Sequence, residues 1–302
     1  MIEAYAKRLR LPYIRNNYRE LIADARENHP DYEKFLEEIL KGETMSRNEN
    51  CIQKRIQLAH FPNRMTLEDF ETEHLRIEIQ QKIKDLSTLD FIRKGENVIL
   101  IGNPGTGKSA LSITLGMEAC LSNMSVLFIG VSDLLIEIRE AMSQNQLLRY
   151  KKRFESFDLV ILDELGYCSF DQKSGEILFN LISSRNGKKS IIVTSNLELD
   201  RWREIFKDEV LTAAMIDRLA YKAHMINMTG QSYRLRETKK WVEEKSRQEN
   251  LKIVPPPRGV IGEGTAQERA AFFIPQWTKF QLLYWTRFQL TQTNGSFLSF
   301  TT

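Results

Sequence analysis

Short apolar runs alternate with segments of helical periodicity between residue 96 and about residue 228. The runs are NVILI, SVLFIG, FDLVILD, KSIIVTSN and HMINM, and β-branched residues are frequent in them. Continuous apolar strands separated by helices are typical of a parallel sheet that helices cover on both faces. The pattern therefore predicts an α/β fold for this region.

A different pattern occupies residues 1 to about 95, where apolar positions recur at helical spacing among charged residues. It is clearest in DYEKFLEEILKGE and in HLRIEIQQKIKDLSTLDFI. Between these segments, Thr66 and Asp69 in NRMTLEDFE form a loose capping-box pattern, which favours the start of a short helix. We expect a small helical N-terminal module that leads into the α/β region.

The chain changes character again after residue 250. VPPPRGVIGEGTAQ reads as a linker because its prolines and glycines interrupt both helices and strands. In the tail that follows, Trp277, Phe280, Tyr284 and Phe288 fall on one helical stripe. The stripe is consistent with docking on a partner, but we favour a tail that packs on its own chain or stays poorly ordered.

The first apolar run of the α/β region is followed by GNPGTGKS, which matches the spacing G-x-x-x-x-G-K-[ST] of a phosphate-binding loop. The loop lies between a strand pattern and the helix-forming run ALSITLGMEACL, as that motif requires. Glycines let consecutive amides turn inward and form a nest for phosphates, which the first turn of the helix extends. We expect the nest to comprise Gly102, Asn103, Pro104, Gly105, Thr106, Gly107, Lys108, Ser109 and Ala110.

Two side chains of this loop have specific expected roles with ATP. Lys108 would reach the β- and γ-phosphates, and Ser109 would hold Mg²⁺. An ordinary glycine-rich turn is the alternative. The match of the loop and of both flanking segments disfavours that alternative.

The third apolar run ends in the acidic pair of DLVILDE. Leu159 to Leu162 predict a buried strand that delivers Asp163 and Glu164 to the carboxyl edge of the sheet, where ligands bind in open α/β folds. We assign Asp163 to Mg²⁺ or its waters, and Glu164 to the general base that polarises the attacking water. An exposed acidic turn is the alternative, and the four preceding apolar residues argue against it. The pair therefore indicates ATP hydrolysis.

One strand, SVLFIG, separates the two motifs along the chain, and we expect another strand to lie between the strands that carry them. This arrangement is typical of hydrolysing motor and switch ATPases. The strand SIIVTSN ends in Thr194, Ser195 and Asn196, and a polar side chain at this tip can bond both the attacking water and the γ-phosphate. We choose Asn196 for that sensing role. Ser195 or Asn196 would also suit the N-cap of a helix before LELDRW, and one residue could serve both roles.

Composition narrows the class of protein without fixing a partner. No segment reaches the roughly eighteen apolar residues of a membrane span and no signal-peptide core is visible, so we expect a cytoplasmic protein with no membrane partner. Cys51, Cys120 and Cys168 form no C-x-x-C pair, and we interpret them as reduced and structural. Residues 201–252 hold 12 Lys/Arg against 8 Asp/Glu, which fits a nucleic-acid surface or, equally, a solvated helix face.

The motifs GNPGTGKS, ILDELGY and VTSN, followed by MIDRLAYKAHMINMTGQSYRLR, resemble the IstB/DnaC-like AAA+ ATPases. The resemblance extends from about residue 1 to residue 245, since YAKRLRLPYIRNNY and RIQLAHFPNRMTLEDFE are similar to the N-terminal region of IstB transposition helpers. By this resemblance, Arg218 in IDRL matches the arginine finger and Arg234 in GQSYR matches the sensor 2 arginine. Spacing alone would favour surface ion pairs for both arginines.

The resemblance implies an AAA+ P-loop ATPase fold in three parts. We expect a helical interaction module over residues 1–72, the ATPase domain over residues 73–248, and a linker with an atypical aromatic tail over residues 249–302. The tail lies beyond the part that resembles the family. It therefore inherits no function from the resemblance.

The function that the resemblance implies is that of an ATP-dependent transposition helper. Such a protein forms a homo-oligomer with ATP and Mg²⁺, captures and bends duplex DNA, and recruits or stimulates the transposase of the same mobile element. Hydrolysis then allows disassembly. A DnaC-type replicative helicase loader is the runner-up, which the N-terminal segment disfavours, and a nucleotide-binding adaptor without turnover is a third interpretation, which the intact Asp163, Glu164 and Asn196 disfavour.

Overall fold

A computed structural model describes residues 1–73, 75–167, 169–230 and 232–251 of the chain. The chain divides into two compact units, Met1–Glu244 and Lys245–Thr302. The aromatic stripe expected within residues 277–288 lies outside the described residues, as does Cys168. The three-part division expected from the sequence stays a prediction.

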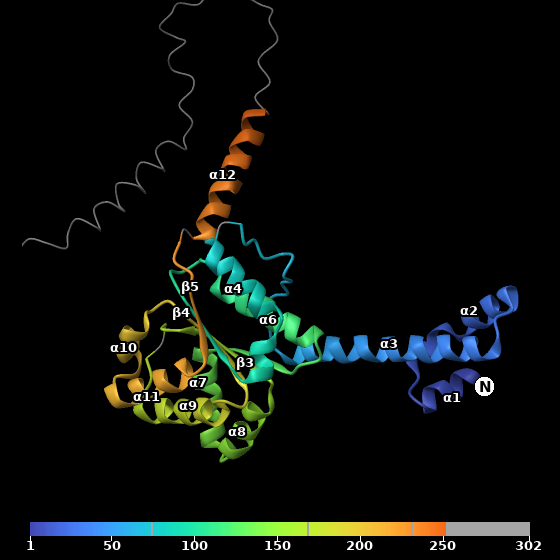
Figure 1. Ribbon diagram of the computed structural model, residues 1–302, viewed down its shortest axis with the longest axis horizontal. Helices are drawn as coiled ribbons and strands as arrows, with labels where there is room; N and C mark the ends of the chain where they lie inside the picture. Colours follow the sequence, from blue (N-terminus) through green and yellow to red (C-terminus); the bar gives the residue numbers. More distant parts are fainter. Residues whose placement is uncertain (74, 168, 231, 252–302) are drawn as a thin grey trace, which may run out of the picture. The chain divides into compact units, whose positions relative to one another are not determined.

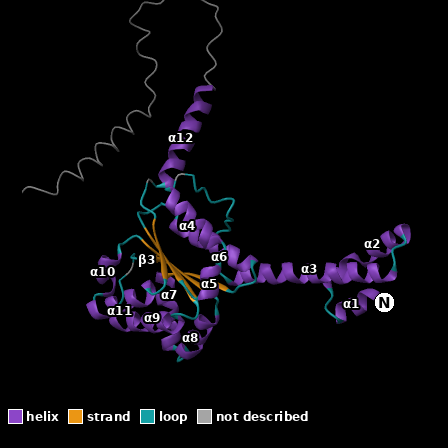
Figure 2. Cartoon of the chain, in the orientation of Figure 1, coloured by secondary structure: helices purple, strands orange, loops and turns teal. Residues whose placement is uncertain are grey.

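Five parallel strands form a sheet in the first unit (Figure 1, Figure 2). Their bounds are β1 Asn97–Ile101, β2 Val126–Gly130, β3 Leu159–Leu165, β4 Ser190–Ser195 and β5 Ala223–Asn227. The order across the sheet is β2-β3-β4-β1-β5, and every neighbouring pair is parallel. All five apolar runs of the sequence are thus strands, and the predicted α/β fold is confirmed.

Helices cover both faces of this sheet, as Figure 2 shows. Successive residues of a strand point to opposite faces, so Val98 and Leu100 of β1 join one apolar core while Ile99 and Ile101 join the other. The first core is completed by the end of α3 Tyr32–Leu58 and by α4 Ile77–Ser87, α5 Asp90–Lys94 and α6 Lys108–Leu121. The second is completed by α7 Val131–Ser143, α8 Leu147–Ser156, α9 Gln172–Arg185, η1 Leu199–Trp202, α10 Arg203–Phe206 and α11 Glu209–Ala220.

The strand order decides which loops meet at the edge of the sheet. β4 lies between β1 and β3, so a strand does intervene between those that carry the glycine loop and the acidic pair, as expected. The SVLFIG run forms β2, which occupies an edge position next to β3. The ends of β1, β4 and β3 are therefore consecutive along the carboxyl edge.

The first three helices of the chain are α1 Ile2–Arg8, α2 Pro12–Asn28 and α3 Tyr32–Leu58. The buried carboxylate of Glu43 in α3 accepts a 3.0 Å hydrogen bond from the backbone amide of Tyr13 in the first turn of α2. The end of α3 contacts the α/β region, because the Phe128 amide of β2 donates to the Ala59 carbonyl at 2.8 Å. The expectation of a helical N-terminal region is confirmed.

The segment between α3 and α4 differs from its prediction. The capping-box bonds do form, since the Thr66 amide donates to Asp69 Oδ2 at 2.9 Å and the Asp69 amide donates to the Thr66 hydroxyl at 3.4 Å. They close a turn instead of starting a helix. The next residue, Phe70, packs on the first core, and the chain does not continue as a helix at this point.

The last described helix is α12 Tyr233–Leu251. Over the described ranges of the chain, every helix is too short or too polar to cross a membrane. Of the two cysteines described, Cys120 is buried in α6 and fits the structural role expected from the sequence, whereas Cys51 in α3 is exposed and does not.

Candidate functional site

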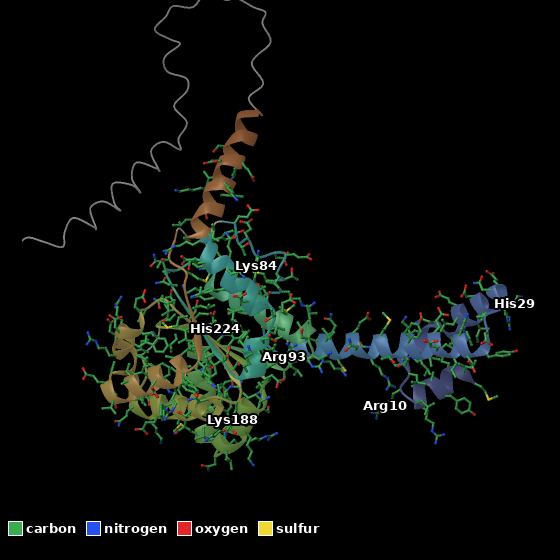
Figure 3. All side chains as sticks on the ribbon, viewed as in Figure 1. Arg10, His29, Lys84, Arg93, Lys188 and His224 are labelled. Atoms are coloured by element: carbon green, nitrogen blue, oxygen red, sulfur yellow. The ribbon has the colours of Figure 1, made fainter. Side chains whose placement is uncertain are left out.

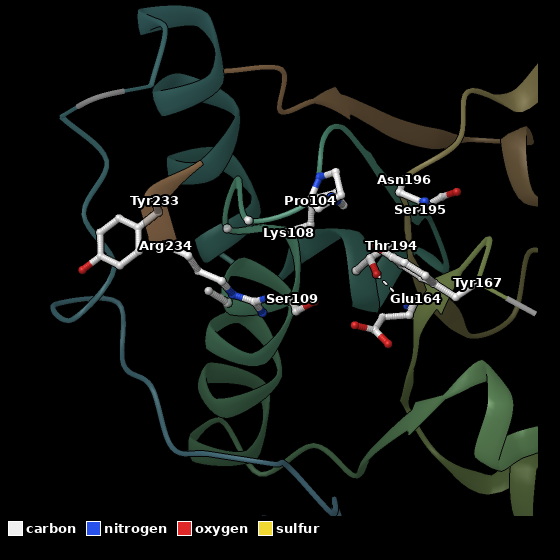
Figure 4. Close-up of a pocket in the computed structure, with 13 residues that line it drawn as sticks. Pro104, Lys108, Ser109, Glu164, Tyr167, Thr194, Ser195, Asn196, Tyr233 and Arg234 are labelled. Carbon is white, nitrogen blue, oxygen red and sulfur yellow. Dashed lines mark hydrogen bonds between the residues drawn. The ribbon is translucent and has the colours of Figure 1, made fainter. Parts of the chain in front are cut away.

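A cleft lies at the carboxyl edge of the sheet, where the segments that follow β1, β3 and β4 meet the start of α12 (Figure 4). It is lined by Pro104, Gly105, Gly107, Lys108, Ser109, Ala110, Glu164, Tyr167, Thr194, Ser195, Asn196, Tyr233 and Arg234. The glycine loop, Glu164, Asn196 and Arg234 were each predicted from the sequence, and the fold brings them together. Arg218 does not line this cleft.

The backbone of the glycine loop adopts a conformation that depends on its glycines. Gly107 has φ of 95° and is the N-cap of α6, a left-handed conformation that strains residues with a side chain. At Gly102, a Cβ atom would lie 2.4 Å from the carbonyl oxygen of Met228, which follows β5. Helix α6 therefore begins at the cleft, and its first amides have no partner within the helix. This arrangement suits a bound phosphate.

Lys108 is held in place by the loop that precedes it. Its Nζ donates to the carbonyl oxygens of Gly102 at 2.7 Å and Asn103 at 2.8 Å, and the residue is buried. Burial lowers the pKa of Lys108, and the positive charge of Arg234 lowers it further, while Asp163 and Glu164 oppose that shift. The positive charges of Lys108 and Arg234 therefore both act in the cleft, and together they favour the binding of a polyanion.

Asp163 is the centre of a hydrogen-bond network that links three elements. Its Oδ1 accepts from the hydroxyl of Ser109 at 2.8 Å and from the hydroxyl of Thr194 at 2.6 Å. The Thr194 hydroxyl in turn accepts from the amide of Glu164 at 2.9 Å, the bond drawn in Figure 4. Ser109 and Asp163 present adjacent oxygen atoms, the ligand type that Mg²⁺ prefers, so these residues fit the predicted ion.

Glu164 owes its position to an irregularity in β3. The pairing of β3 with β4 shifts register between Leu162 and Leu165, and Glu164 has a left-handed φ of 64°. Such a bulge re-aims side chains, and strain of this kind clusters at functional sites. Asp163 consequently stays buried while Glu164 is exposed to the cleft, where Figure 4 shows its carboxylate.

Asn196 presents a buried acceptor to this edge of the sheet. Within the described residues, its Oδ1 atom is buried and lacks a hydrogen-bond partner. Gly166, with φ of 136°, makes room for it, because a Cβ atom there would lie 2.2 Å from Asn196 Oδ1. The side chain of Asn196 thus packs against Gly166, while the residue lines the cleft beside Ser195.

The alternative N-cap role of Ser195 or Asn196 is wrong. Helix η1 has Glu198 at its N-cap, and no side chain caps it. The Ser195 hydroxyl is engaged instead with the backbone of Leu197, from whose amide it accepts a 3.1 Å bond. The N-cap of η1 therefore lies two residues after Asn196 and three after Ser195.

Sequence reasoning gave no role to three residues that line the cleft. Thr194 was noted only as one of three polar residues at a strand tip, yet it bridges Asp163 and Glu164. Tyr167 follows the acidic pair closely, and Tyr233 precedes Arg234 with its amide donating to the Gly105 carbonyl at 2.8 Å. Their nearness to recognised motifs was the available signal.

Arg218 lies at the other edge of the sheet. It occupies the last turn of α11, and its Nη1 is 2.9 Å from a carboxylate oxygen of the adjacent Asp217. The next residue, Leu219, accepts a 3.1 Å bond at its carbonyl from the side chain of Asn97, the first residue of β1. The glycine loop follows the opposite end of β1, about 15 Å away along the strand. The arginine therefore serves no nucleotide in its own cleft.

Comparisons with known proteins agree with this geometry. The model of the family described as IstB-like ATP binding protein matches residues 4–241. A protein named as the ATP-binding protein of insertion sequence IS5376 from Geobacillus stearothermophilus is 35% identical over 246 residues, or 82% of this chain and 98% of that protein. Its counterpart named for IS21 from Pseudomonas aeruginosa is 33% identical over 239 residues, or 79% of this chain and 90% of that protein.

Two solved structures are also similar to parts of this chain. The crystal structure of DnaI aligns with a TM-score of 0.49 and 21% identity, covering 59% of this chain and 98% of that one. DnaA from Aquifex aeolicus, bound to AMPPCP, aligns with a TM-score of 0.49 and 18% identity, covering 65% of this chain and 59% of that one.

Proposed function

The chain belongs to the family of IstB-like ATP-binding proteins, and from that premise we propose that it is an ATP-dependent transposition helper. In this proposal it assembles with ATP into a homo-oligomer on target DNA in the cytoplasm and remodels the duplex. The assembly recruits or stimulates the transposase of the same mobile element, and ATP hydrolysis then drives disassembly.

The observation that carries the proposal is the convergence of Lys108, Asp163 and Glu164 at one edge of the sheet, in a chain whose relatives are named for insertion sequences. A loop that only binds nucleotide needs the lysine and the amides of α6. An exposed carboxylate beside that loop adds a base for water. The combination supports turnover of ATP rather than static binding.

The chain's own groups supply each part of that reaction. The first amides of α6 and Lys108 hold the phosphates, and Ser109 and Asp163 would hold Mg²⁺, which neutralises phosphate charge when bound. Thr194 orients Asp163 through its hydroxyl. Glu164 takes a proton from the attacking water, while the side-chain amide of Asn196, a residue that lines the same cleft, would bond that water and the terminal phosphate. Arg234 adds positive charge where the terminal phosphate separates.

Binding to DNA in two nucleotide states tests the proposal. We would measure duplex and single-strand binding with ATP and with ADP by fluorescence anisotropy across a salt series. The proposal expects ATP to favour duplex binding without strong sequence preference, and affinity to fall steeply with salt as counterions are released. Purified transposase should then bind to the complex. Tight capture of a hexameric helicase without ATP-dependent duplex binding would instead identify a helicase loader.

A further inference from the structure

The N-terminal helices contain a second hollow, which we call the basic groove. Its lining comes from residues 6–54 and includes Lys7, Arg10, Arg15, Arg47 and Lys54. The remaining lining residues are uncharged, so no carboxylate lines the groove. Helices α1 to α3 contribute to it together, and none of its residues belongs to the nucleotide cleft.

The basic groove arises because positive side chains gather on one surface of the N-terminal helices, and not because these helices carry a large net positive charge. Residues 1–58 contain 11 Lys/Arg and 10 Asp/Glu, so this part of the chain is nearly neutral. Five of those cations gather in one hollow. Among the described residues, Arg47 has a carboxylate partner in Glu43, and the other four cations form no ion pair with any carboxylate. The positive charges of the groove repel one another, and an anion bound from outside the chain would offset that repulsion.

Specific bonds hold the walls of the groove in place. Arg47 donates from Nη2 to the carbonyl of Arg10 at 3.0 Å and from Nε to buried Glu43 at 3.2 Å. Arg10, labelled in Figure 3, follows α1 with a left-handed φ of 56°. On α3, Arg47, Cys51 and Lys54 recur at intervals of four and three, which places them on one face of the helix. The α1–α2 connection and this face of α3 thus form one built surface.

We propose that the basic groove binds the sugar-phosphate backbone of duplex DNA. This inference rests on the proposed function and adds a contact surface to it. The segment of α3 from Arg47 to Lys54 is about 10 Å long, which matches about three successive steps of one DNA strand at 3.4 Å each. A small anion would need converging, buried donors, whereas these cations are spread along an open groove. Contacts of this kind position a protein on DNA and read no base sequence.

A matched pair of double variants tests the groove. Arg15→Gln with Lys54→Gln removes two unpaired cations from it, while Lys34→Gln with Lys41→Gln removes two from residues outside its lining on α3. Both variants carry the same net charge. The groove variant should flatten the slope of log affinity against log salt by about 2 and weaken duplex binding about 10–100-fold at 0.1 M salt. The matched variant should keep the parent slope, and both should bind ATP normally.

Cys51 provides a second readout because it lines the groove and is exposed. In a Cys168→Ser background, with Cys120 buried, we would time the reaction of Cys51 with a maleimide in the presence of ATP. Duplex DNA should slow that reaction at least tenfold, and transposase alone should not. Protection by transposase without DNA would overturn the inference and identify the groove as a site for an acidic protein segment.

Duplex binding by the parent protein and by the groove variant distinguishes failure of this inference from failure of the proposed function. Parent protein that binds no duplex in either nucleotide state would overturn both. Parent protein that binds duplex, together with a groove variant that keeps the parent salt slope, would overturn the inference alone. Circular dichroism and ATP binding of each variant would establish that it is folded.

Discussion

Two cationic side chains with expected roles at ATP, Lys108 and Arg218, are placed in opposite ways. Lys108 is buried at the carboxyl edge of the sheet and is held by two carbonyl oxygens of its own loop. The side chain of Arg218 is 45% exposed, and its ion-pair partner within the described residues is its neighbour Asp217, which is 73% exposed. The first is held by its own loop, whereas the second is open to solvent.

The difference fits our prediction that the two residues act in different subunits. The ammonium group of Lys108 is held among the amides of its own loop, where phosphates of a nucleotide bound to the same chain would meet it. An exposed arginine near the amino edge of its own sheet is available to a neighbouring molecule. We therefore expect the cleft to bind ATP within one subunit and to hydrolyse it rapidly only when another subunit supplies Arg218.

The largest expected effect is on ATP turnover, and mixing variants of Lys108 and Arg218 separates the roles of the two residues. Arg218→Ala should lower turnover on the order of 10³-fold or more, the range known for arginines supplied in trans in GTPases. Lys108→Ala should also be inactive. Mixing the two should restore part of the activity, because a mixed interface pairs an intact cleft with an intact arginine. Co-assembly shown by light scattering, with no recovery of phosphate release, would place Arg218 outside the reaction.

The next effect distinguishes binding from chemistry inside the cleft. Lys108→Ala should weaken ATP binding, since it removes the charge that faces the phosphates. Glu164→Gln should bind ATP like the parent and lose about 10²–10⁴-fold in turnover, because it removes the base but keeps the shape. Calorimetric titration and phosphate release measure the two properties. A folded Glu164→Gln protein that hydrolyses ATP at the parent rate would show that the base is another group.

A smaller effect tests the support of Asn196. Gly166→Ala would force a Cβ atom toward Asn196 Oδ1, and a displacement of that size can cost about 10²-fold in turnover. Gly187→Ala is the matched control, because Gly187 also has a positive φ, of 69°, but a Cβ atom there meets nothing within 4 Å. Both variants should lose some stability in thermal unfolding. Equal turnover of the two would mean that Asn196 is not held by this contact.

The smallest effect is a shift in pH dependence. The pKa of Lys108 is lowered by burial and by Arg234, so its charge is lost at a lower alkaline pH than for a free lysine. Arg234→Ala removes a positive neighbour and should raise that pKa. The alkaline loss of ATP affinity should then move to higher pH, measured with a fluorescent ATP analogue. An unchanged midpoint would place Arg234 too far from Lys108 to act on it.

Local sequence was sufficient to predict the strands, because burial imposes continuous apolar runs. It was also sufficient to predict the glycine loop and the acidic pair, because phosphate binding imposes a fixed spacing. It could not reveal contacts that depend on strand order. The bridge of Thr194 between Asp163 and Glu164 exists only because β4 lies beside β3. The left-handed conformation of Glu164 likewise arises from a register shift between strands that are distant in sequence.

Two further features could not be predicted from the sequence and became apparent only in the structure. The basic groove joins Arg10 and Arg15 to a face of α3 that lies more than 30 positions further along the chain. The alternative N-cap role for Ser195 or Asn196 is wrong, since η1 has Glu198 at its N-cap and the Ser195 hydroxyl accepts a bond from the Leu197 amide. Both outcomes depend on side-chain partners that a residue pattern does not specify.

The lifetime of the DNA complex tests the central claim most directly, since that claim links hydrolysis in the cleft to release from DNA. We would load parent, Lys108→Ala and Glu164→Gln protein on a fluorescent duplex with ATP and follow dissociation after adding unlabelled competitor. The account predicts that Lys108→Ala fails to load, and that Glu164→Gln loads normally but remains bound at least tenfold longer than the parent. Dissociation of Glu164→Gln at the parent rate, with ATP still intact on the protein, would contradict it.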